Sequence, residues 1–296
     1  MKIGLIVNPQ AGKKNIKRFL PQIEKTVSSK GQLTTFVTHK RKDCFDLAYQ
    51  LSNENYSIII GCGGDGTINE IINGIFYSNN LPLLGLIPQG TSNVYAITFQ
   101  IPTNPIEASK IILKNNIKKV DVGVVENSEE KKRYFLSMIG VGFDAWVTYL
   151  VPYWLRTLIG GVNAHIVTGI VEFLFHRSFI FEIEFNNQKY RASQVIVSNS
   201  PFYGGNTHLA PEAKVDDSLL DICMLKRDKP KDIISFAINI KRKKYASLQN
   251  IISSKSQYIK IKGNKIIPFQ TDGEADIWSN KIEIRILPKK LSIITP

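Results

Sequence analysis

The segment 58–75 reads IIIGCGGDGTINEIINGI and joins two different hydrophobic patterns. Residues 58–60 form a continuous isoleucine run, which is typical of a buried strand. Isoleucines at 68, 71, 72 and 75 then recur at intervals of three and four residues, which is typical of one face of a helix. Between the two patterns lie four glycines, Asp65 and Thr67. The segment therefore predicts a strand, a glycine-rich turn and a helix in direct succession.

The whole chain has 296 residues, of which 43% are hydrophobic, and a net charge of +13. This length favours two globular domains, and the hydrophobic content excludes the disordered class. The three cysteines, Cys44, Cys62 and Cys223, show neither metal-ligand spacing nor a disulfide framework, which favours a reducing compartment. The positive charge favours anionic partners such as nucleotides, nucleic acids or acidic membrane surfaces.

The most apolar region, 149–175, does not have the composition of a membrane-spanning helix. Its longest charge-free run, 157–171, is shorter than the roughly 20 residues that such a helix needs. The N-terminal residues MKIGLIVNP are too few for a signal peptide and predict a first buried strand instead. We therefore expect a soluble or peripheral protein.

The first 120 residues alternate between strand-like and helix-like runs, which indicates a parallel sheet covered on both faces. The predicted strands are 3–7, 34–38, 58–61 and 83–87, and the predicted helices are 16–29, 43–51, 68–77 and 105–113. After Val120 short strand-like runs dominate, which indicates an antiparallel β-sandwich. These runs are 120–125, 134–138, 179–185, 190–198, 219–225, 258–261 and 281–286, with helical insertions at 149–175 and 231–252. We expect domains at 1–121 and 122–287, with 288–296 as a candidate to pack back on the first.

The glycine-rich turn at 61–67 has the chemistry of a phosphate site. Glycines let backbone N–H groups approach phosphate oxygens, and the helix that follows adds the positive end of its dipole. Asp65 would repel phosphate by itself, so it suggests a bridging Mg²⁺ or a proton-transfer network. The turn lacks the lysine of GxxxxGK[ST] and is not GxGxxG. A tight turn with a helix-capping residue remains the structural alternative.

Three further polar turns are predicted at the same sheet edge. NPQAG, residues 8–12, ends the first strand; Thr38 closes the second; and PQGTSN, residues 88–93, ends the fourth. Because ligands bind beyond the carboxyl ends of parallel strands, the four turns together favour a binding cleft over independent turns.

Six motifs follow one another along the chain: NPQAG, GGDGTINE, PQGTSN, GVGFDA, YGGNTHLAPEAKVDDSLLDI and DGE. Together they resemble the diacylglycerol kinase catalytic-domain family, which includes bacterial lipid kinases and sphingosine kinases. The resemblance runs from Asn8 to Glu274. NAD kinases share GGDGT, whereas NPxAG and the GG…APxAxxDD block are more specific to lipid kinases.

The resemblance implies an α/β N-terminal domain like those of NAD kinase and phosphofructokinase, which binds ATP, and a C-terminal antiparallel β-sandwich for the lipid substrate. In the sandwich, a structural Mg²⁺ would be held by the Asp217 carboxylate and the carbonyls of Lys214 and Leu219. The implied catalytic residues are Glu274 as general base, Asp272 close by, and Asp65; Asp65 and Asp121 match acids of a Mg²⁺ and water network. The implied nucleotide contacts are Asn8, Pro9, Gln10, Ala11, Gly12, Thr38, Gly64, Asp65, Gly66, Thr67, Ile68, Asn69, Glu70, Thr91, Asn93 and Asp121.

The chain departs from the family pattern at two positions. Many members carry an acid directly after the asparagine of GTxN, where this chain has Val94, so one member of the acid network is missing. The pair Asp216-Asp217 is usually followed by glycine, where this chain has Ser218. If that turn needs a positive φ, serine costs stability and weakens the metal site.

Several surface features have two interpretations. Lys13, Lys14 and Arg18 are either phosphate partners or a solvated helix face. The segment 233–271 contains eight basic residues and no acidic one, and either faces acidic lipid or is solvated: Lys241, Arg242, Lys243, Lys244, Lys255, Lys260, Lys262 and Lys265. An aromatic group is either core or a lipid entrance that touches a bilayer: Tyr149, Tyr153, Trp154, Phe173 and Phe175.

The function expected from this resemblance is ATP-dependent phosphorylation of a lipid hydroxyl. The lipid would be diacylglycerol-like or long-chain-base-like, and the enzyme cytoplasmic and peripheral at the inner membrane face. ATP and Mg²⁺ are the expected cofactors; an anionic membrane, but no nucleic acid, is an expected partner. The oligomeric state is open, a homodimer included. The alternatives are an NAD kinase-like nucleotide kinase, and a catalytically weak lipid- or nucleotide-binding regulator, which Val94 keeps open.

Overall fold

A computed structural model of the chain describes residues 1–12, 15–40, 42–114, 116–159, 163–164, 167–169, 171–172, 179–203, 205–226 and 251–296. The chain divides into two compact units, Met1–Val120 together with Lys289–Pro296, and Asp121–Pro288. It passes from one unit to the other within two long strands, β5 (Ile117–Asn127) and β16 (Glu274–Ile294). The assignment of nucleotide to the first unit and lipid to the second stays a prediction.

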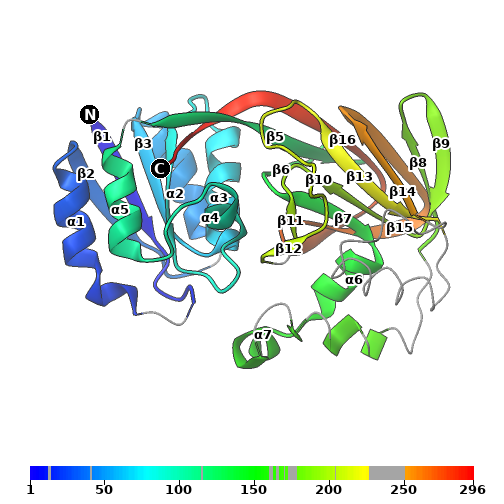
Figure 1. The fold of residues 1–296 in the computed structure, drawn as a ribbon, viewed down its shortest axis with the longest axis horizontal. Helices are drawn as coiled ribbons and strands as arrows, with labels where there is room; N and C mark the ends of the chain where they lie inside the picture. Colours follow the sequence, from blue (N-terminus) through cyan, green and yellow to red (C-terminus); the bar gives the residue numbers. More distant parts are fainter. Residues whose placement is uncertain are drawn as a thin grey trace. The chain divides into compact units, whose positions relative to one another are not determined.

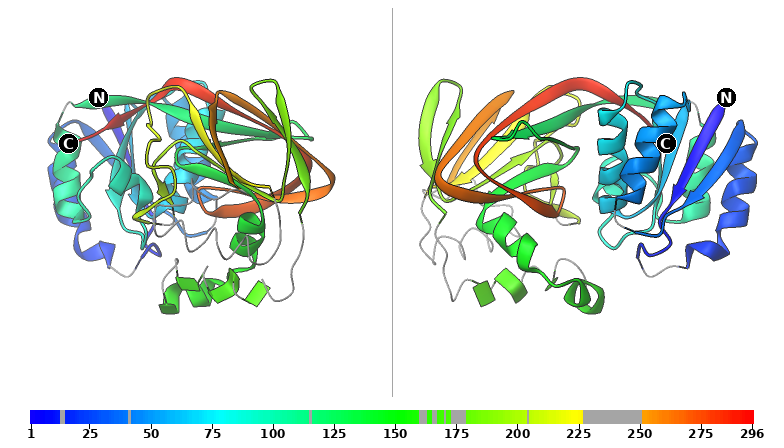
Figure 2. Two further views of the ribbon diagram at one scale, coloured as in Figure 1. Left: turned by 45° about the vertical axis from the view of Figure 1, so that its right-hand side comes forward. Right: turned by 180° about the vertical axis from the view of Figure 1, so that it is seen from behind.

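The first unit is a parallel sheet with helices on both faces (Figures 1 and 2). Its strands run in the order β4-β3-β1-β2, and Ile293 of β16 pairs in parallel with Leu84 of β4. The strands are β1 (Lys2–Val7), β2 (Gln32–Val37), β3 (Ile58–Gly63) and β4 (Leu83–Pro88). Helices α1 (Leu20–Ser28) and α5 (Pro105–Leu113) cover one face, and α2 (Asp43–Asn53) and α3 (Asp65–Tyr77) cover the other.

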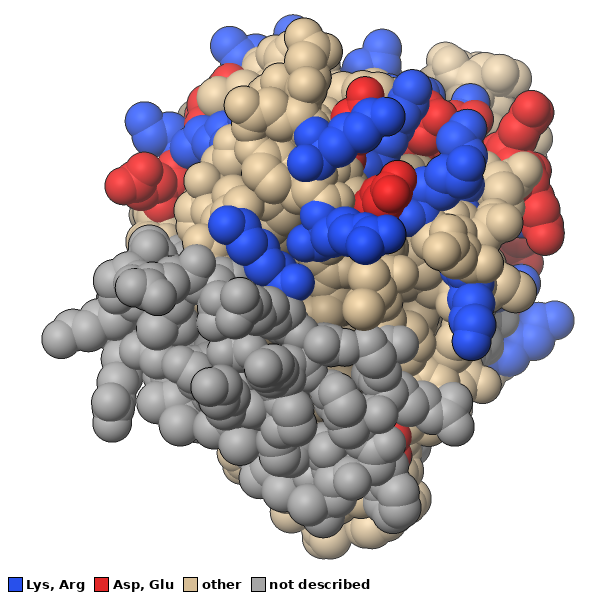
Figure 3. Space-filling model, turned by 90° about the vertical axis from the view of Figure 1, so that its right-hand side faces the viewer, with Lys and Arg blue, Asp and Glu red and all other residues tan. Residues whose placement is uncertain are grey.

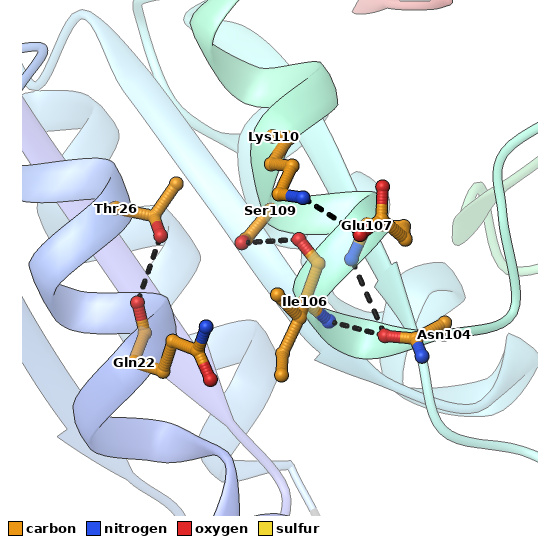
Figure 4. A network of polar contacts seen from close by, with 7 residues as sticks. All are labelled: Gln22, Thr26, Asn104, Ile106, Glu107, Ser109 and Lys110. Carbon is orange, nitrogen blue, oxygen red and sulfur yellow. Dashed lines mark hydrogen bonds and ion pairs between the residues drawn. The ribbon is translucent and has the colours of Figure 1, made fainter.

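Helix α5 shows how local chemistry fixes an element boundary (Figure 4). The Asn104 side chain accepts hydrogen bonds from the backbone N–H groups of Ile106 and Glu107, at 2.9 and 3.3 Å. This N-cap satisfies two donors that the first helical turn leaves without partners. Glu107 also pairs with Lys110 at 2.8 Å, one turn further along. The prediction of a helix at 105–113 is therefore confirmed.

Other boundaries of the first unit differ from the predicted ones. Helix α3 begins at Asp65 and not at 68, because Gly64 adopts an extended N-cap conformation directly before it. The predicted helix 16–29 is a 3-10 turn, η1 (Ile16–Arg18), followed by α1, whose second residue is Pro21 and cannot donate a backbone hydrogen bond. A short helix, α4 (Val94–Thr98), was not predicted.

The second unit is an antiparallel β-sandwich, which confirms the predicted fold class. One path of strands runs β14-β13-β10-β7-β15-β16, while β6 pairs with β5, β8 with β15 and β9 with β8. A core cluster contains apolar side chains from most of these strands, including Phe135, Ile183, Val197, Ile222 and Ile284. The bounds are β6 (Lys132–Phe135), β7 (Met138–Gly142), β8 (Phe181–Phe185), β9 (Gln188–Ala192), β10 (Gln194–Ser198), β11 (Phe202–Tyr203), β12 (Thr207–His208), β13 (Leu220–Leu225), β14 (Ile251–Ser256) and β15 (Tyr258–Thr271).

Several predicted elements of the second unit were wrong in extent. The run 134–138 spans the end of β6 and the start of β7, and 190–198 is divided between β9 and β10. The predicted strand 258–261 is only the start of β15, whose pairing with β16 shifts register between Lys262 and Ile267. Polar residues at that shift interrupt the apolar pattern, so the sequence predicted a shorter strand. The predicted helix 231–252 lies outside the described residues except for 251 and 252, which belong to β14.

The predicted helical insertion 149–175 begins earlier and is interrupted. Helix α6 (Phe143–Leu150) ends before Pro152, and α7 (Tyr153–Ile159) follows it. Most of 160–178 lies outside the described residues. Within the part of the chain that the structure describes, no helix combines the length and apolar character needed to cross a membrane.

Candidate active site

Three glycine-containing turns meet at the carboxyl ends of β1, β3 and β4. Gly12 has φ +67°, and a Cβ added there would lie 1.7 Å from the carbonyl oxygen of Gln89. A Cβ added to Gly90 would lie 2.7 Å from the Cα of Gly64. Only glycine allows backbones to approach this closely. The NPQAG, GGDGT and PQGTSN segments therefore form one continuous surface of main-chain atoms, as the sequence predicted for this sheet edge.

Side chains join the first two of these turns. The Asn8 side chain donates a 2.9 Å hydrogen bond from Nδ2 to the Thr67 hydroxyl, and its Oδ1 accepts one from the Gln10 backbone N–H at 3.0 Å. Thr67 lies in the first turn of α3 and is 6% exposed. Asn8 thus holds the NPQAG turn against the start of α3 and fixes the position of the Thr67 oxygen.

The first turn of α3 has the features of an anion site. Its N-cap, Gly64, has no side chain to accept the first helical N–H groups, and the positive end of the helix dipole lies here. The Asp65 Oδ1 accepts the backbone N–H of Tyr95 at 3.2 Å, which ties α4 to α3. A small hollow adjoins this turn and is lined by Gly63, Gly64, Asp65, Ile68, Leu86, Pro88, Asn93, Tyr95 and Ala96.

Asn93 shapes the PQGTSN turn. It has φ +47°, accepts the Gly90 N–H at 2.8 Å through Oδ1, and donates to the Gly90 carbonyl at 2.8 Å through Nδ2. Thr91, in the same turn, is exposed. Val94 is half-buried at the first position of α4, so no carboxylate extends from this point of the turn. Asn93 therefore fixes the loop conformation, and Thr91 is exposed in the same turn.

Three more of the predicted nucleotide residues, Thr38, Asn69 and Glu70, make contacts within the first unit. The buried Thr38 hydroxyl donates to the Val7 carbonyl at 3.3 Å, and Glu70 accepts the Lys42 N–H at 3.4 Å. Asn69 is fully buried and accepts from the Asn73 side chain at 3.2 Å. These contacts hold the β2 loop and α3 in place. Lys13 and Lys14 lie outside the described residues, and Arg18 is exposed in η1.

The DGE segment of the second unit is a two-residue hairpin turn. Thr271 and Glu274 pair across it, while Asp272 and Gly273 have φ +51° and +88°. Positive φ at both central residues is characteristic of a type I′ turn, for which Asp-Gly is a preferred pair. The turn places Glu274 at the first position of β16, half-buried.

The Asp272 carboxylate is engaged by the backbone of a neighbouring segment. It accepts three N–H groups, from Leu136 at 2.9 Å, Ser137 at 2.9 Å and Met138 at 2.8 Å. All three residues are buried. This geometry gives Asp272 a structural role in the turn, and Glu274 as the general base stays a prediction.

Sequence reasoning missed two buried residues next to this turn. Gln270 is 1% exposed, donates to the Asp144 carboxylate at 2.9 Å, and accepts the Gly273 N–H at 2.8 Å. A Cβ on Gly140 would lie 2.1 Å from the Asp144 carboxylate. The GVGFDA motif, which contains both Gly140 and Asp144, was the available signal. Gly140 leaves room for the Asp144 carboxylate, and that carboxylate holds the Gln270 side chain next to the turn.

Asp121 is buried within the second unit. Its carboxylate accepts the Ser218 N–H at 2.6 Å, and its own N–H donates to the Val215 carbonyl at 2.7 Å. Asn199 donates to the Asp121 carbonyl at 3.1 Å. These bonds fix the turn at 215–218. A nucleotide contact from Asp121 stays a prediction.

The expected structural metal site is centred on Asp217, whose surroundings argue against a divalent ion. Ser218 has φ +63°, the conformation that favours glycine at this position. Asp217 Oδ1 accepts the Leu219 N–H at 3.1 Å, and its Oδ2 lies 3.7 Å from the Lys255 ammonium. The same ammonium lies 3.1 Å from Asp221. A cation of the chain itself is thus already beside the proposed ligand. Among the described residues, no group of three or more His, Cys, Asp or Glu side chains is placed to hold a metal.

The basic segment is partly neutralised where the structure describes it. Lys260 lies opposite Glu184 in the pairing of β15 with β8, and Lys262 lies opposite Glu182. Figure 3 shows a face on which Asp and Glu side chains lie among the Lys and Arg side chains. Lys241, Arg242, Lys243 and Lys244 lie outside the described residues. The described part therefore has the alternating charge of a solvated sheet.

The predicted aromatic group divides into packed and exposed members. Tyr149 stacks on Trp146 with ring centroids 6.1 Å apart and meets Trp278 edge-on at 5.4 Å. These rings hold α6 against β16. Trp154 of α7 is 63% exposed, and Leu158 is 69% exposed. The Tyr153 side chain, Phe173 and Phe175 lie outside what the structure describes.

Comparisons with known proteins agree with this architecture. Residues 2–125 match the family model of the diacylglycerol kinase catalytic domain, and residues 137–295 match that of the YegS C-terminal NAD kinase beta sandwich-like domain. The chain is 29% identical over 274 residues to the diacylglycerol kinase of Bacillus subtilis (strain 168), covering 91% of this chain and 88% of the relative. It is 28% identical over 275 residues to the diacylglycerol kinase of Staphylococcus aureus (strain bovine RF122 / ET3-1), covering 91% and 85%.

A solved structure of a candidate diacylglycerol kinase from Bacillus anthracis str. Sterne superimposes on the whole chain with a TM-score of 0.83 and 26% identity, and 95% of that structure is covered. With both family models matched in order, the chain belongs to the diacylglycerol kinase catalytic-domain family of lipid kinases.

Proposed function

We propose that the chain transfers the γ-phosphate of ATP to the hydroxyl of a diacylglycerol-like lipid at a membrane surface. The observation that carries the nucleotide half of the proposal is the backbone contact among the three glycine turns. A surface of main-chain N–H groups at a helix N-terminus suits a polyphosphate. The curated relatives named diacylglycerol kinase support the lipid half.

The residues of the first unit bind and orient the phosphates in this proposal. The N–H groups that follow Gly64 bind phosphate oxygens, and the Thr67 hydroxyl, oriented by Asn8, donates to another. Mg²⁺ would neutralise the phosphate charge, and Asp65 is the carboxylate that we assign to its water shell, since Mg²⁺ keeps several waters and takes few carboxylates. Phosphoryl transfer needs mainly such positioning and charge neutralisation.

The second unit supplies the base. The oxygen of the lipid hydroxyl forms a bond to the γ-phosphorus, and Glu274 takes the hydroxyl proton. The bond between the γ-phosphorus and the oxygen that bridges it to the β-phosphate breaks, which releases ADP. Asp272 is the poorer base because three backbone N–H groups already use its oxygens.

Membrane contact belongs to the same proposal. The exposed Trp154 and Leu158 of α7 support a shallow apolar contact, since tryptophan suits the membrane interface. Binding to anionic vesicles should weaken when both are replaced by alanine. Unchanged binding of that double variant would remove α7 from the proposed contact surface.

The substrate is tested by incubating the chain with γ-labelled ATP, Mg²⁺ and separate acceptors. These are diacylglycerol, a long-chain base, phosphatidylglycerol, undecaprenol and NAD. We expect label in the product of diacylglycerol. Label on NAD would support the nucleotide kinase alternative, and label on no acceptor, with ATP still bound, would support the regulator.

A further inference from the structure

The turn at 212–221 concentrates negative charge. Within ten residues it carries Glu212, Asp216, Asp217 and Asp221, and the only basic residue among them in sequence is Lys214. Carboxylates gathered in one turn repel one another unless a cation lies among them.

Lys255 reaches this turn from the neighbouring strand. It lies directly opposite Asp221 in the antiparallel pairing of β13 with β14. Its ammonium lies 3.1 Å from the Asp221 carboxylate, 3.7 Å from that of Asp217, and donates to the Glu212 carbonyl at 3.3 Å. These are two carboxylates and one main-chain carbonyl, the oxygen types that otherwise hold a divalent cation.

The ammonium is also held in place. The Lys255 side chain is 32% exposed, and its partners Asp217 and Asp221 are 23% and 15% exposed. The Asn186 side chain donates to the Lys255 carbonyl at 2.9 Å, and Gln257, two residues further along, donates to the Ser218 carbonyl at 3.3 Å. A charge pair that is partly withdrawn from water is screened less than a surface pair.

We propose that the ammonium of Lys255 is the structural cation of the 212–221 turn and takes the place of a divalent metal ion there. A divalent ion on Asp217 would lie within a few ångströms of this ammonium, and their repulsion opposes its binding. The chain therefore carries its own cation and holds the turn without Mg²⁺. This assignment is independent of which lipid is phosphorylated.

The experiment measures unfolding of the second unit by tryptophan fluorescence, in EDTA and in excess MgCl₂, without nucleotide. All three tryptophans, Trp146, Trp154 and Trp278, belong to this unit. The wild-type midpoint should be the same in both buffers. A midpoint that rises with Mg²⁺ in the wild-type chain would overturn the proposal, and this readout needs no variant to fold.

Lys255→Met, which keeps the apolar stem, should lower the midpoint in EDTA by about 4 °C or more, because it leaves two carboxylates without their cation. It should also gain a Mn²⁺ site, detected by electron paramagnetic resonance, that Asp217→Asn removes. Lys260→Met is the matched control, since it removes an equal charge from an exposed strand position. It should neither lower the midpoint nor create a Mn²⁺ site. A Lys255→Met chain that gains no Mn²⁺ site would overturn the proposal.

Discussion

Replacing Asp272 by asparagine separates the structural acid of the DGE turn from the catalytic one. Asparagine tolerates the φ of +51° as well as aspartate does, so the turn conformation is not itself the perturbation. The substitution changes the hydrogen-bond acceptors that residue 272 offers to the backbone of 136–138. The carboxylate accepts the N–H groups of Ser137 and Met138 on Oδ1 and that of Leu136 on Oδ2. An amide retains one oxygen and places an NH₂ group against a donor.

The cost follows from these three bonds. A buried N–H left without an acceptor costs about 1–3 kcal/mol. Each of the two retained hydrogen bonds becomes weaker by about 0.5–1.5 kcal/mol, because its acceptor is no longer charged. The total is about 2–6 kcal/mol. For a domain of about this size each kcal/mol lowers Tm by about 2–4 °C, so the midpoint should fall by at least ~4 °C.

The assay is thermal unfolding followed by tryptophan fluorescence, with Glu274→Gln as the matched control. Glu274→Gln should leave the midpoint close to that of the wild-type chain. If Asp272→Asn instead unfolds like the wild type but loses turnover by 100-fold or more, Asp272 is the chemical group and its assignment as a structural acid is wrong.

Three further predictions concern the nucleotide loops, the turn at Ser218 and the cysteines. Gly12→Ala should weaken ATP binding at least tenfold, because its Cβ would lie 1.7 Å from the Gln89 carbonyl oxygen and φ is +67°. The control is Gly169→Ala, whose Cβ would lie 3.9 Å from the Val147 side chain, and equal affinities in both variants would contradict the loop geometry. Ser218→Gly should raise the midpoint of the second unit by relieving φ +63°, worth up to about 1 kcal/mol, and a lower midpoint would show that the serine is favoured there. Burial raises the pKa of Cys44, Cys62 and Cys223 to about 12 each, so a thiol reagent at pH 8 should label none in the native chain and all three in denaturant; rapid native labelling would contradict their burial.

The parallel sheet and its loops were predictable because their signals are local. The isoleucine run and the glycines of 58–75 mark the end of β3 without reference to the rest of the chain. Even the positive φ at Ser218 followed from the usual glycine at its position. Contacts between Gly12 and Gln89, or Gly64 and Gly90, are long-range, and sequence spacing carries no record of them.

The second unit was predicted less well, since its strands bend and its key side chains act at a distance in sequence. Asp272 and Glu274 are equivalent acids in sequence, and only the bonds from 136–138 distinguish them. Lys255 counted as one of eight basic residues, and only the pairing of β13 with β14 places it opposite Asp221. A tertiary partner, and not the residue type, decided the role in each case.

We infer that this chain phosphorylates a lipid hydroxyl with Glu274 as the base. This inference is tested most directly by the single-turnover transfer of label from γ-labelled ATP to diacylglycerol, with ATP saturating, in the wild-type and Glu274→Gln chains. We expect labelled product in the wild type and a rate lower by about 10²–10⁴-fold in Glu274→Gln, at unchanged ATP affinity. Equal rates in the two chains, or no labelled lipid in either, would contradict it.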